Sequence, residues 1–244
     1  MKTLIFTLLL SLFSYQAFAY NSDDLARVTN GFGCPQGDLS GAELSGKSLD
    51  GLDFSGCDFS GARMVGVKLN NANLTGAKMR KTIITDAELN GAQMDAADFT
   101  YANFAGSDLS NTTIINATLF RTVLTNCKLK YADLRNSNLQ EATLDGAAAE
   151  NADFTSANLS FAWLYKTGLT GASLMRANLY NAKLQSANLT NADLTGANFS
   201  RAKLQNANLS QAKLDKAQLS EADFTGADLS FTDFGRAFKD DAKF

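Results

Sequence analysis

The chain has 244 residues, 22 of them Lys or Arg and 25 Asp or Glu, which gives a formal net charge of −3 at pH 7. It contains no histidine, and this excludes Ser-His triads, Cys-His dyads and imidazole metal sites. The mild negative charge gives no sign of binding to nucleic acids or anionic membranes, since either would require a basic patch.

The first 19 residues have the pattern of a secretory signal peptide. Lys2 precedes an apolar run from Leu4 to Phe13, and Ala17-Phe18-Ala19 supplies the small residues of a cleavage site. The run is too short for a membrane span, and it lies outside the repeat register described below, which argues against a buried helix. We therefore predict that residues 1–19 are removed, leaving a periplasmic or secreted mature chain without a membrane span.

Residues 20–36 are predicted to form an N-terminal cap. The segment from Ser22 to Val28 begins with Ser and two Asp residues, which favour the start of a helix. Gly31, just beyond the segment, favours a stop. We expect a short capped helix here.

Residues 37–236 form an uninterrupted run of five-residue repeats. Large apolar residues recur at every fifth position from Leu39 to Phe234, and only Ala149 breaks this pattern. The residue two positions before each centre is nearly always small, and turn-forming pairs such as Thr195-Gly196 follow the centres. Because five is odd, a continuous strand would direct successive centres to opposite faces. The chain must therefore turn once per repeat and coil on itself.

The repeat is similar to the Ala-Asp/Asn-Leu-x-x pattern of the pentapeptide-repeat family. Residues 187–199, Ala-Asn-Leu-Thr-Asn-Ala-Asp-Leu-Thr-Gly-Ala-Asn-Phe, carry the resemblance most clearly. It implies an all-β fold, a right-handed quadrilateral parallel β-helix with four repeats per coil. The whole run would then make about ten coils, each touching only its neighbours, with residues 20 positions apart stacked on each other.

Residues 237–244 are predicted to form a C-terminal tail or cap. Phe234, Phe238 and Phe244 offer apolar cover for the last coil or, alternatively, a surface for a homodimer. Within the coil, Ala149 is expected to leave a void or a local pinch, because it replaces a Leu-sized side chain.

The coil that the resemblance implies brings two cysteines together. Cys57 would stack above residue 37, within reach of Cys34 in the cap. For an exported chain we predict a Cys34–Cys57 disulfide that staples the cap to the first coil. Cys127 is predicted to be an inert core residue.

No catalytic, cofactor-binding or metal-binding motif emerges, and we predict that the chain is not an enzyme. Asp133, Asp153 and Asp193 align at multiples of 20 residues with Ser173 between them, and such carboxylates can in principle bind Ca²⁺ or transfer protons. The pattern instead favours a solvated face, since no concave site surrounds it. A second column, predicted to form a structural amide ladder, consists of Asn138, Asn158, Asn178 and Asn198.

Aromatic residues gather along one ridge of the expected coil. Single exposed aromatic residues are normal on protein surfaces, so the prediction of a binding surface rests on the clustering of several of them. Tyr, Trp and Arg are also the residues enriched in binding hot spots. The predicted partner-binding residues are Tyr101, Phe120, Arg121, Phe161, Trp163, Tyr165 and Tyr180.

These features favour an exported, non-enzymatic scaffold that binds an unidentified protein partner through one face of the solenoid. One alternative comes from the family, some of whose members mimic DNA, bind type II topoisomerases and protect against quinolones. An exported chain would not meet a topoisomerase, and its small net charge imitates DNA poorly. A carbohydrate-binding surface is the other alternative, because Trp and Tyr stack on sugar rings as well as on proteins.

Overall fold

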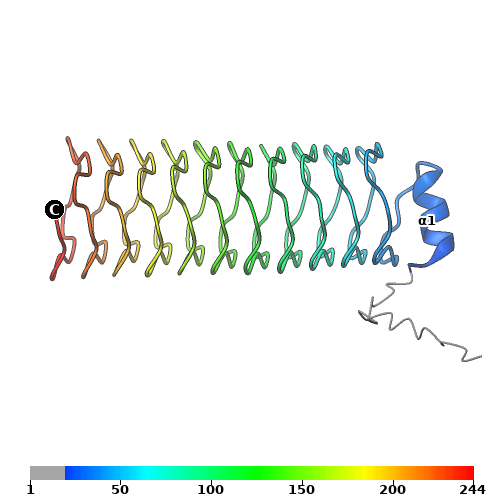
Figure 1. Ribbon diagram of the computed structural model, residues 1–244, viewed down its shortest axis with the longest axis horizontal. Coiled ribbons are helices and arrows are strands. Elements are labelled where there is room, and N and C mark those ends of the chain that lie inside the picture. Colours follow the sequence, from blue (N-terminus) through cyan, green and yellow to red (C-terminus); the bar gives the residue numbers. More distant parts are fainter. Residues whose placement is uncertain (1–19) are drawn as a thin grey trace, which may run out of the picture.

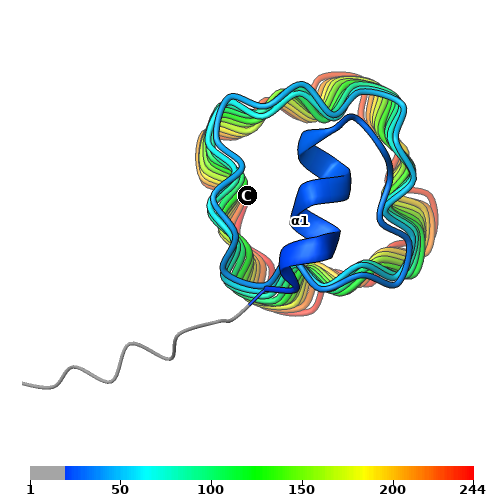
Figure 2. The ribbon, with the colours of Figure 1, turned by 90° about the vertical axis from the view of Figure 1, so that its right-hand side faces the viewer.

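A computed structural model describes residues 20–244, and the signal peptide predicted for residues 1–19 lies outside the described residues. The described chain forms a rod of stacked coils with a single helix, α1 (Ser22–Thr29), at its N-terminal end (Figure 1). Seen along its axis, the rod has four sides (Figure 2). The five-residue repeat therefore builds one elongated solenoid, as the sequence predicts.

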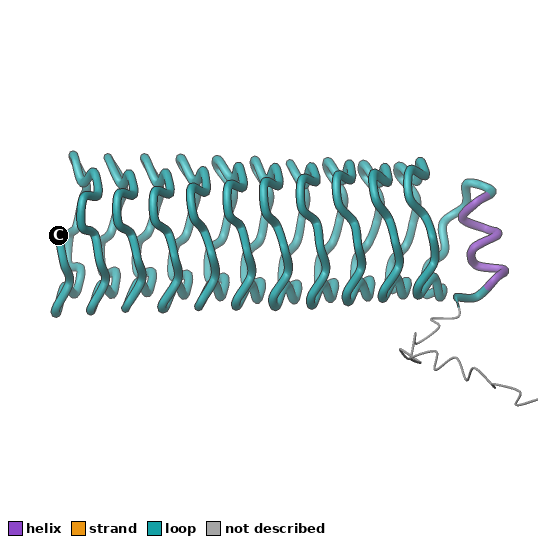
Figure 3. Tube along the Cα trace, viewed as in Figure 1, coloured by secondary structure: helices purple, strands orange, loops and turns teal. Residues whose placement is uncertain are grey.

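Parallel pairing between residues 20 positions apart joins successive coils. Bridges run from Asp38–Asp58 to Asp223–Lys243, and every fifth residue takes part. At the first bridge, the Asp58 N–H donates to the Gly37 carbonyl at 2.9 Å, and the Leu39 N–H donates to the Asp58 carbonyl at 2.8 Å. Each repeat pairs through one residue only. Residues 20–244 therefore contain no strand of several consecutive paired residues, and most of the trace is drawn as loop (Figure 3). The coil of four repeats is confirmed by this pairing.

The two apolar positions of each repeat fill the interior. The centres from Leu39 to Phe224 are buried, as are the small residues between Cys57 and Ala222. Most Ser and Thr residues at the small position donate their hydroxyl to a carbonyl in the coil below, as when Thr82 Oγ1 donates to the Phe59 carbonyl at 2.8 Å. Thr112 instead donates to the Leu109 carbonyl of its own coil at 2.7 Å. Ala149 leaves the backbone pairing regular, because its N–H still donates to the Gly168 carbonyl at 2.7 Å.

The Asp or Asn before many centres caps the turn that follows. The Asn158 side-chain oxygen, for example, accepts the Ser160 N–H at 3.1 Å. This bond explains why the repeat favours Asp and Asn at an outward position. In the Asn column, each amide also donates to the amide one coil below, at 3.2 Å in all three steps from Asn198 down to Asn138. The predicted amide ladder is confirmed.

Helix α1 covers the N-terminal end of the first coil. Its N-cap, Asn21, accepts the backbone N–H groups of Asp23 and Asp24. Val28 is buried, and the Asp24 carboxylate accepts the Asp38 N–H at 2.9 Å. The helix thus pairs backbone groups that have no coil beneath them. Among residues 20–244, no helix is long and apolar enough to cross a membrane.

The last eight residues continue the coil instead of forming the predicted tail. Phe238 and Lys243 occupy bridge positions opposite Gln218 and Asp223. Residue 239, the position of the next centre after Phe234, is a Lys. Its ammonium lies outside the core, 4.1 Å from the centroid of the Phe234 ring. Phe244 takes the next centre and stacks on Phe224 with 5.3 Å between the centroids, so it does provide apolar cover.

Candidate partner-binding surface

One corner of the rod carries most of the predicted partner-binding residues. This corner is built from the turns at residues 100–101 and 120–121 and from the turns that follow them every 20 residues. Along it lie two clusters of similar composition, which together we call the corner ridge. The first consists of Tyr101, Phe120, Arg121 and Glu141, and the second of Phe161, Tyr180, Arg201 and Glu221.

In the first cluster, Arg121 links two aromatic rings to a carboxylate. The rings of Tyr101 and Phe120 meet edge to face with centroids 5.8 Å apart. The Arg121 guanidinium lies 5.1 Å from the Phe120 centroid and donates to the Tyr101 hydroxyl at 3.3 Å. Its Nε donates to Glu141 at 2.7 Å. The hydrogen bonds to Glu141 and Tyr101 raise the pKa of Arg121 and hold its side chain in place.

The second cluster makes the same kinds of hydrogen bond, but its Arg lies one coil beyond the aromatic pair. The rings of Phe161 and Tyr180 meet edge to face at 5.6 Å. Arg201 donates to the Tyr180 hydroxyl at 3.1 Å and to both Glu221 oxygens at 3.0 Å. The 80 residues between Arg121 and Arg201 equal four coils, or about 19 Å at the usual spacing of paired strands. The sequence prediction missed Arg201 and Glu221, although this 80-residue spacing was the signal for both.

Several of these large side chains occupy a backbone position that suits Gly or Asn better. Tyr101, Arg121, Phe161 and Arg201 are the second residues of their turns and have φ between 55° and 61°. That left-handed conformation disfavours residues with a bulky Cβ substituent. The corner ridge therefore places aromatic and Arg side chains at positions where the backbone alone would select smaller residues.

Beside the corner ridge lies a side of the rod with Trp163 at its centre. Lys183, the next residue in the column, has its Nζ 3.3 Å from the centroid of the Trp163 ring. Tyr165 lies in the adjoining turn, with the Lys166 Nζ 5.0 Å from its centroid. These side chains border an open depression of about 300 Å³, which we call the Trp163 hollow. It is lined by Asp145, Trp163, Tyr165, Lys183 and Gln185.

The seven predicted residues thus fall into three neighbouring groups. Tyr101, Phe120 and Arg121 belong to the first cluster, Phe161 and Tyr180 to the second, and Trp163 and Tyr165 to the Trp163 hollow. Tyr101, Phe161, Trp163 and Tyr165 are each between 41 and 47% exposed. Phe120 and Tyr180 are half-buried against their ring partners. Other residues at the surface, Asp145 and Gln185, were not predicted, because nothing in a five-residue period marks polar turn residues as neighbours of Trp163.

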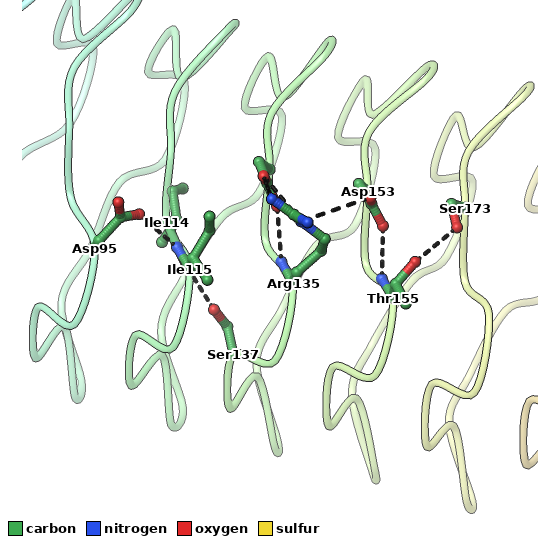
Figure 4. A network of polar contacts seen from close by, with 9 residues as sticks. Asp95, Ile114, Ile115, Arg135, Ser137, Asp153, Thr155 and Ser173 are labelled. Atoms are coloured by element: carbon green, nitrogen blue, oxygen red, sulfur yellow. Dashed lines mark hydrogen bonds and ion pairs between the residues drawn. The ribbon is translucent and has the colours of Figure 1, made fainter.

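The acidic column of Asp133, Asp153 and Asp193 lies on the side of the rod opposite Trp163, and its carboxylates contact other residues of the chain (Figure 4). Arg135 donates to both Asp133 oxygens and lies 3.8 Å from Asp153. Burial raises the pKa of Asp133, but the hydrogen bonds from Arg135 outweigh burial and hold this pKa below its usual range. Asp153 accepts the Thr155 N–H at 2.8 Å, and Thr155 in turn bonds Ser173. Residues 20–244 contain no group of three His, Cys, Asp or Glu side chains placed to hold a metal ion.

All three cysteines are buried free thiols, so the predicted Cys34–Cys57 disulfide is not formed in the structure. The predicted proximity is present, because the Cys34 sulfur fills the space beneath Cys57 that a side chain at Gly37 would take. The two thiols are close enough to hydrogen bond, and the Asp24 carboxylate lies beside them. Burial raises the pKa of both thiols, which leaves them protonated and unreactive.

The pentapeptide-repeat family model matches this chain in eight copies, in segments that together cover residues 38–114, 117–171 and 172–238. The chain belongs to the pentapeptide-repeat family. Family members fold as right-handed quadrilateral β-helices and are generally non-enzymatic scaffolds. No catalytic family is indicated.

Solved structures of the same family resemble the chain over most of its length. HetL, a pentapeptide-repeat protein involved in heterocyst differentiation regulation from the cyanobacterium Nostoc sp. strain PCC 7120, is 28% identical. The match covers 92% of this chain and 96% of HetL, with a TM-score of 0.65. Full-length QnrB1, a plasmid-mediated fluoroquinolone resistance protein, is 21% identical over 81% of this chain and 93% of its own, with a TM-score of 0.54. A trypsin-treated form of QnrB1 gives 17% identity, coverages of 74% and 90%, and a TM-score of 0.56. No match was found among curated proteins.

Proposed function

We propose that this chain is an exported, non-enzymatic scaffold that binds a protein partner through the corner ridge and the Trp163 hollow. The observation that carries the proposal is that the Arg and Tyr side chains of the corner ridge are held in place by hydrogen bonds beside exposed aromatic rings. Arg121 and Arg201 are each held by a carboxylate and a Tyr hydroxyl. Side chains that are already ordered lose less conformational entropy when a partner binds.

The residue types and their placement also suit a protein interface. Tyr, Trp and Arg dominate binding hot spots, and here they share one corner and the side next to it. An isolated exposed aromatic lies elsewhere on the rod, at Tyr131, which is 55% exposed and has only Lys130 over its ring. Tyr131 therefore provides a matched control for the clustered residues.

The topoisomerase alternative has less support. The similarity to QnrB1 is below 25% identity and so concerns the fold alone. On the surface proposed for binding, Glu141, Glu221 and Asp145 are interspersed with aromatic rings, Arg and Lys and form no dense array of acids. A DNA mimic needs closely spaced negative charge along the rod.

The binding proposal is tested with paired substitutions that spare the fold. Phe161→Ser is compatible with the left-handed turn, because Ser156 and Ser186 already occupy equivalent positions with φ of 60° and 59°. Combined with Trp163→Ser, it should abolish co-purification of the partner with the tagged mature chain, while Tyr131→Ser leaves co-purification unchanged. Unchanged co-purification in the double variant, with the circular dichroism of the native fold retained, contradicts the proposal.

Export is tested separately by fractionating the native host and sequencing the N-terminus of the recovered protein. The proposal predicts a mature chain that begins at Tyr20 in the exported fraction. A full-length chain that begins at Met1 in the cytoplasm contradicts export, and would return the topoisomerase alternative to consideration.

We also propose that the coil of residues 225–244 contacts a second copy of the chain. Phe231, Phe238 and Phe244 in this coil are 89, 59 and 58% exposed. Stacking against an equivalent coil would remove these rings from water and pair the backbone edge. Light scattering should give the mass of two mature chains, falling to one for Phe238→Ser. A monomeric mass for the unsubstituted chain contradicts this proposal.

A further inference from the structure

The lysines around Trp163 differ from the other cations of the neighbouring surface in having no acidic partner. None of the ten ion pairs formed by residues 20–244 includes Lys166, Lys183 or Lys203. Lys183 and Lys166 instead lie over the rings of Trp163 and Tyr165. On the adjoining corner, by contrast, each Arg of the ridge is paired with a Glu.

The three lysines lie close together because of the coil. Lys183 follows Trp163 in the bridge column, and Lys203 follows Lys183. Lys166 belongs to the turn that borders the same side, next to Tyr165. The result is a local group of three ammonium ions beside two exposed rings, in a chain whose formal net charge is −3.

The two carboxylates that border this group, Asp145 and Asp223, keep their charge but accept hydrogen bonds from neutral groups of the chain and form no ion pair with the three lysines. One Asp145 oxygen accepts the Tyr165 N–H at 2.8 Å. Asp223, next to Lys203 in the column, accepts Thr225 through one oxygen and Gln205 through the other. The surface therefore presents unused hydrogen-bond donors beside apolar rings, and its complement is a ligand with negatively charged acceptors flanking an apolar group.

We propose that the partner segment bound at the Trp163 hollow is acidic, with Asp or Glu side chains on either side of an apolar residue. The apolar residue packs on Trp163 and Tyr165, and its neighbours pair with Lys183, Lys203 and Lys166. This inference rests on the proposed function and specifies the chemistry of the partner. A neutral sugar ring fits less well, because it offers no negatively charged group to Lys183, Lys203 and Lys166.

The test uses the mature chain, residues 20–244, and labelled nonapeptides with a central Phe. The flanking residues are Asp and Glu in one peptide and Asn and Gln in the other, so that the two differ in charge alone. Fluorescence anisotropy should show the acidic peptide binding about tenfold more tightly at low salt, with a preference that shrinks as salt is added.

Three variants test whether this surface is responsible. Lys183→Gln combined with Lys203→Gln should remove the preference for the acidic peptide. Lys213→Gln, a change of another lysine without an ion-pair partner but on the opposite side of the rod, should leave the preference intact. Trp163→Ser should weaken the binding of both peptides.

Equal affinity for the two peptides overturns the acidic-segment inference, and so does binding of neither. Tighter binding of polygalacturonate or single-stranded DNA than of the acidic peptide, lost in Trp163→Ser, also overturns it. None of these results decides the proposed function, which is judged by co-purification of the native partner with the Phe161→Ser and Trp163→Ser double variant. Loss of that co-purification together with equal peptide affinities would mean that the surface binds a protein through its rings alone.

Discussion

The amide ladder gives a graded test of what holds one coil to the next. Asn158 makes three hydrogen bonds: it donates to Asn138 at 3.2 Å, and its oxygen accepts from Asn178 at 3.2 Å and from the Ser160 N–H at 3.1 Å. Asn158→Ala removes all three. At about 1 kcal/mol for each net hydrogen bond, and with water replacing part of what is lost at this half-buried site, the free energy of unfolding should fall by about 2–3 kcal/mol.

Two further substitutions, at the ends of the ladder, set the scale. Asn138→Ala removes the acceptor of Asn158 and the cap on Gln140, and Asn198→Ala removes the bond to Asn178 and the cap on Ser200. Each variant loses two hydrogen bonds instead of three, so each should cost about 1 kcal/mol less than Asn158→Ala. The assay is urea unfolding followed by far-ultraviolet circular dichroism. Equal losses for all three variants would refute the ladder as a source of stability.

Three other predictions concern the core, the turns and the thiols. Ala149→Leu should raise the free energy of unfolding by about 1 kcal/mol, because the Leu side chain fills the space that the alanine leaves at this repeat centre. No gain in stability would mean that the coil has already closed around the alanine. Burial raises the pKa of Asp98, but hydrogen bonds from Thr100 and Arg80 outweigh it, and the folded pKa lies below the usual value. The resulting stability is present above the unfolded pKa of about 4 and is lost as the pH falls through the folded value. The melting temperature should therefore drop in acid, and a curve for Asp98→Asn as steep as that of the unsubstituted chain would contradict this assignment. Burial raises the pKa of Cys127 to about 12, so a maleimide should label it only after unfolding, and labelling of the native rod would be inconsistent with the buried position.

The five-residue period was sufficient to predict the core and the turns. Every centre from Leu39 to Phe224 is buried, because an odd period with a turn in each repeat leaves one inward direction for the large side chain. The fourfold coil was taken from the family resemblance, and pairing between residues 20 apart now supplies it. Once residues 20 apart are stacked, the Asn ladder follows from the sequence alone.

Contacts between long side chains at the corners were less predictable. Arg121 and Arg201 were equally visible in the sequence, but which rings and acids they bond depends on rotamers that no period encodes. At the C-terminal end the prediction stopped at residue 236, two residues after the last apolar centre of the unbroken run, and Lys239 occupies the next centre. The backbone pairing of Phe238 and Lys243 holds the coil there, while the Lys239 side chain lies outside.

The most direct test of the proposed function places a photocrosslinking amino acid at position 185, in the lining of the Trp163 hollow, and separately at position 173 on the opposite side of the rod. The account predicts a discrete crosslinked partner from position 185, lost when Phe161 and Trp163 are changed to Ser, and none from position 173. Equal crosslinking from the two positions, or a position-185 product that survives the double change, would contradict the claim that this surface binds the partner.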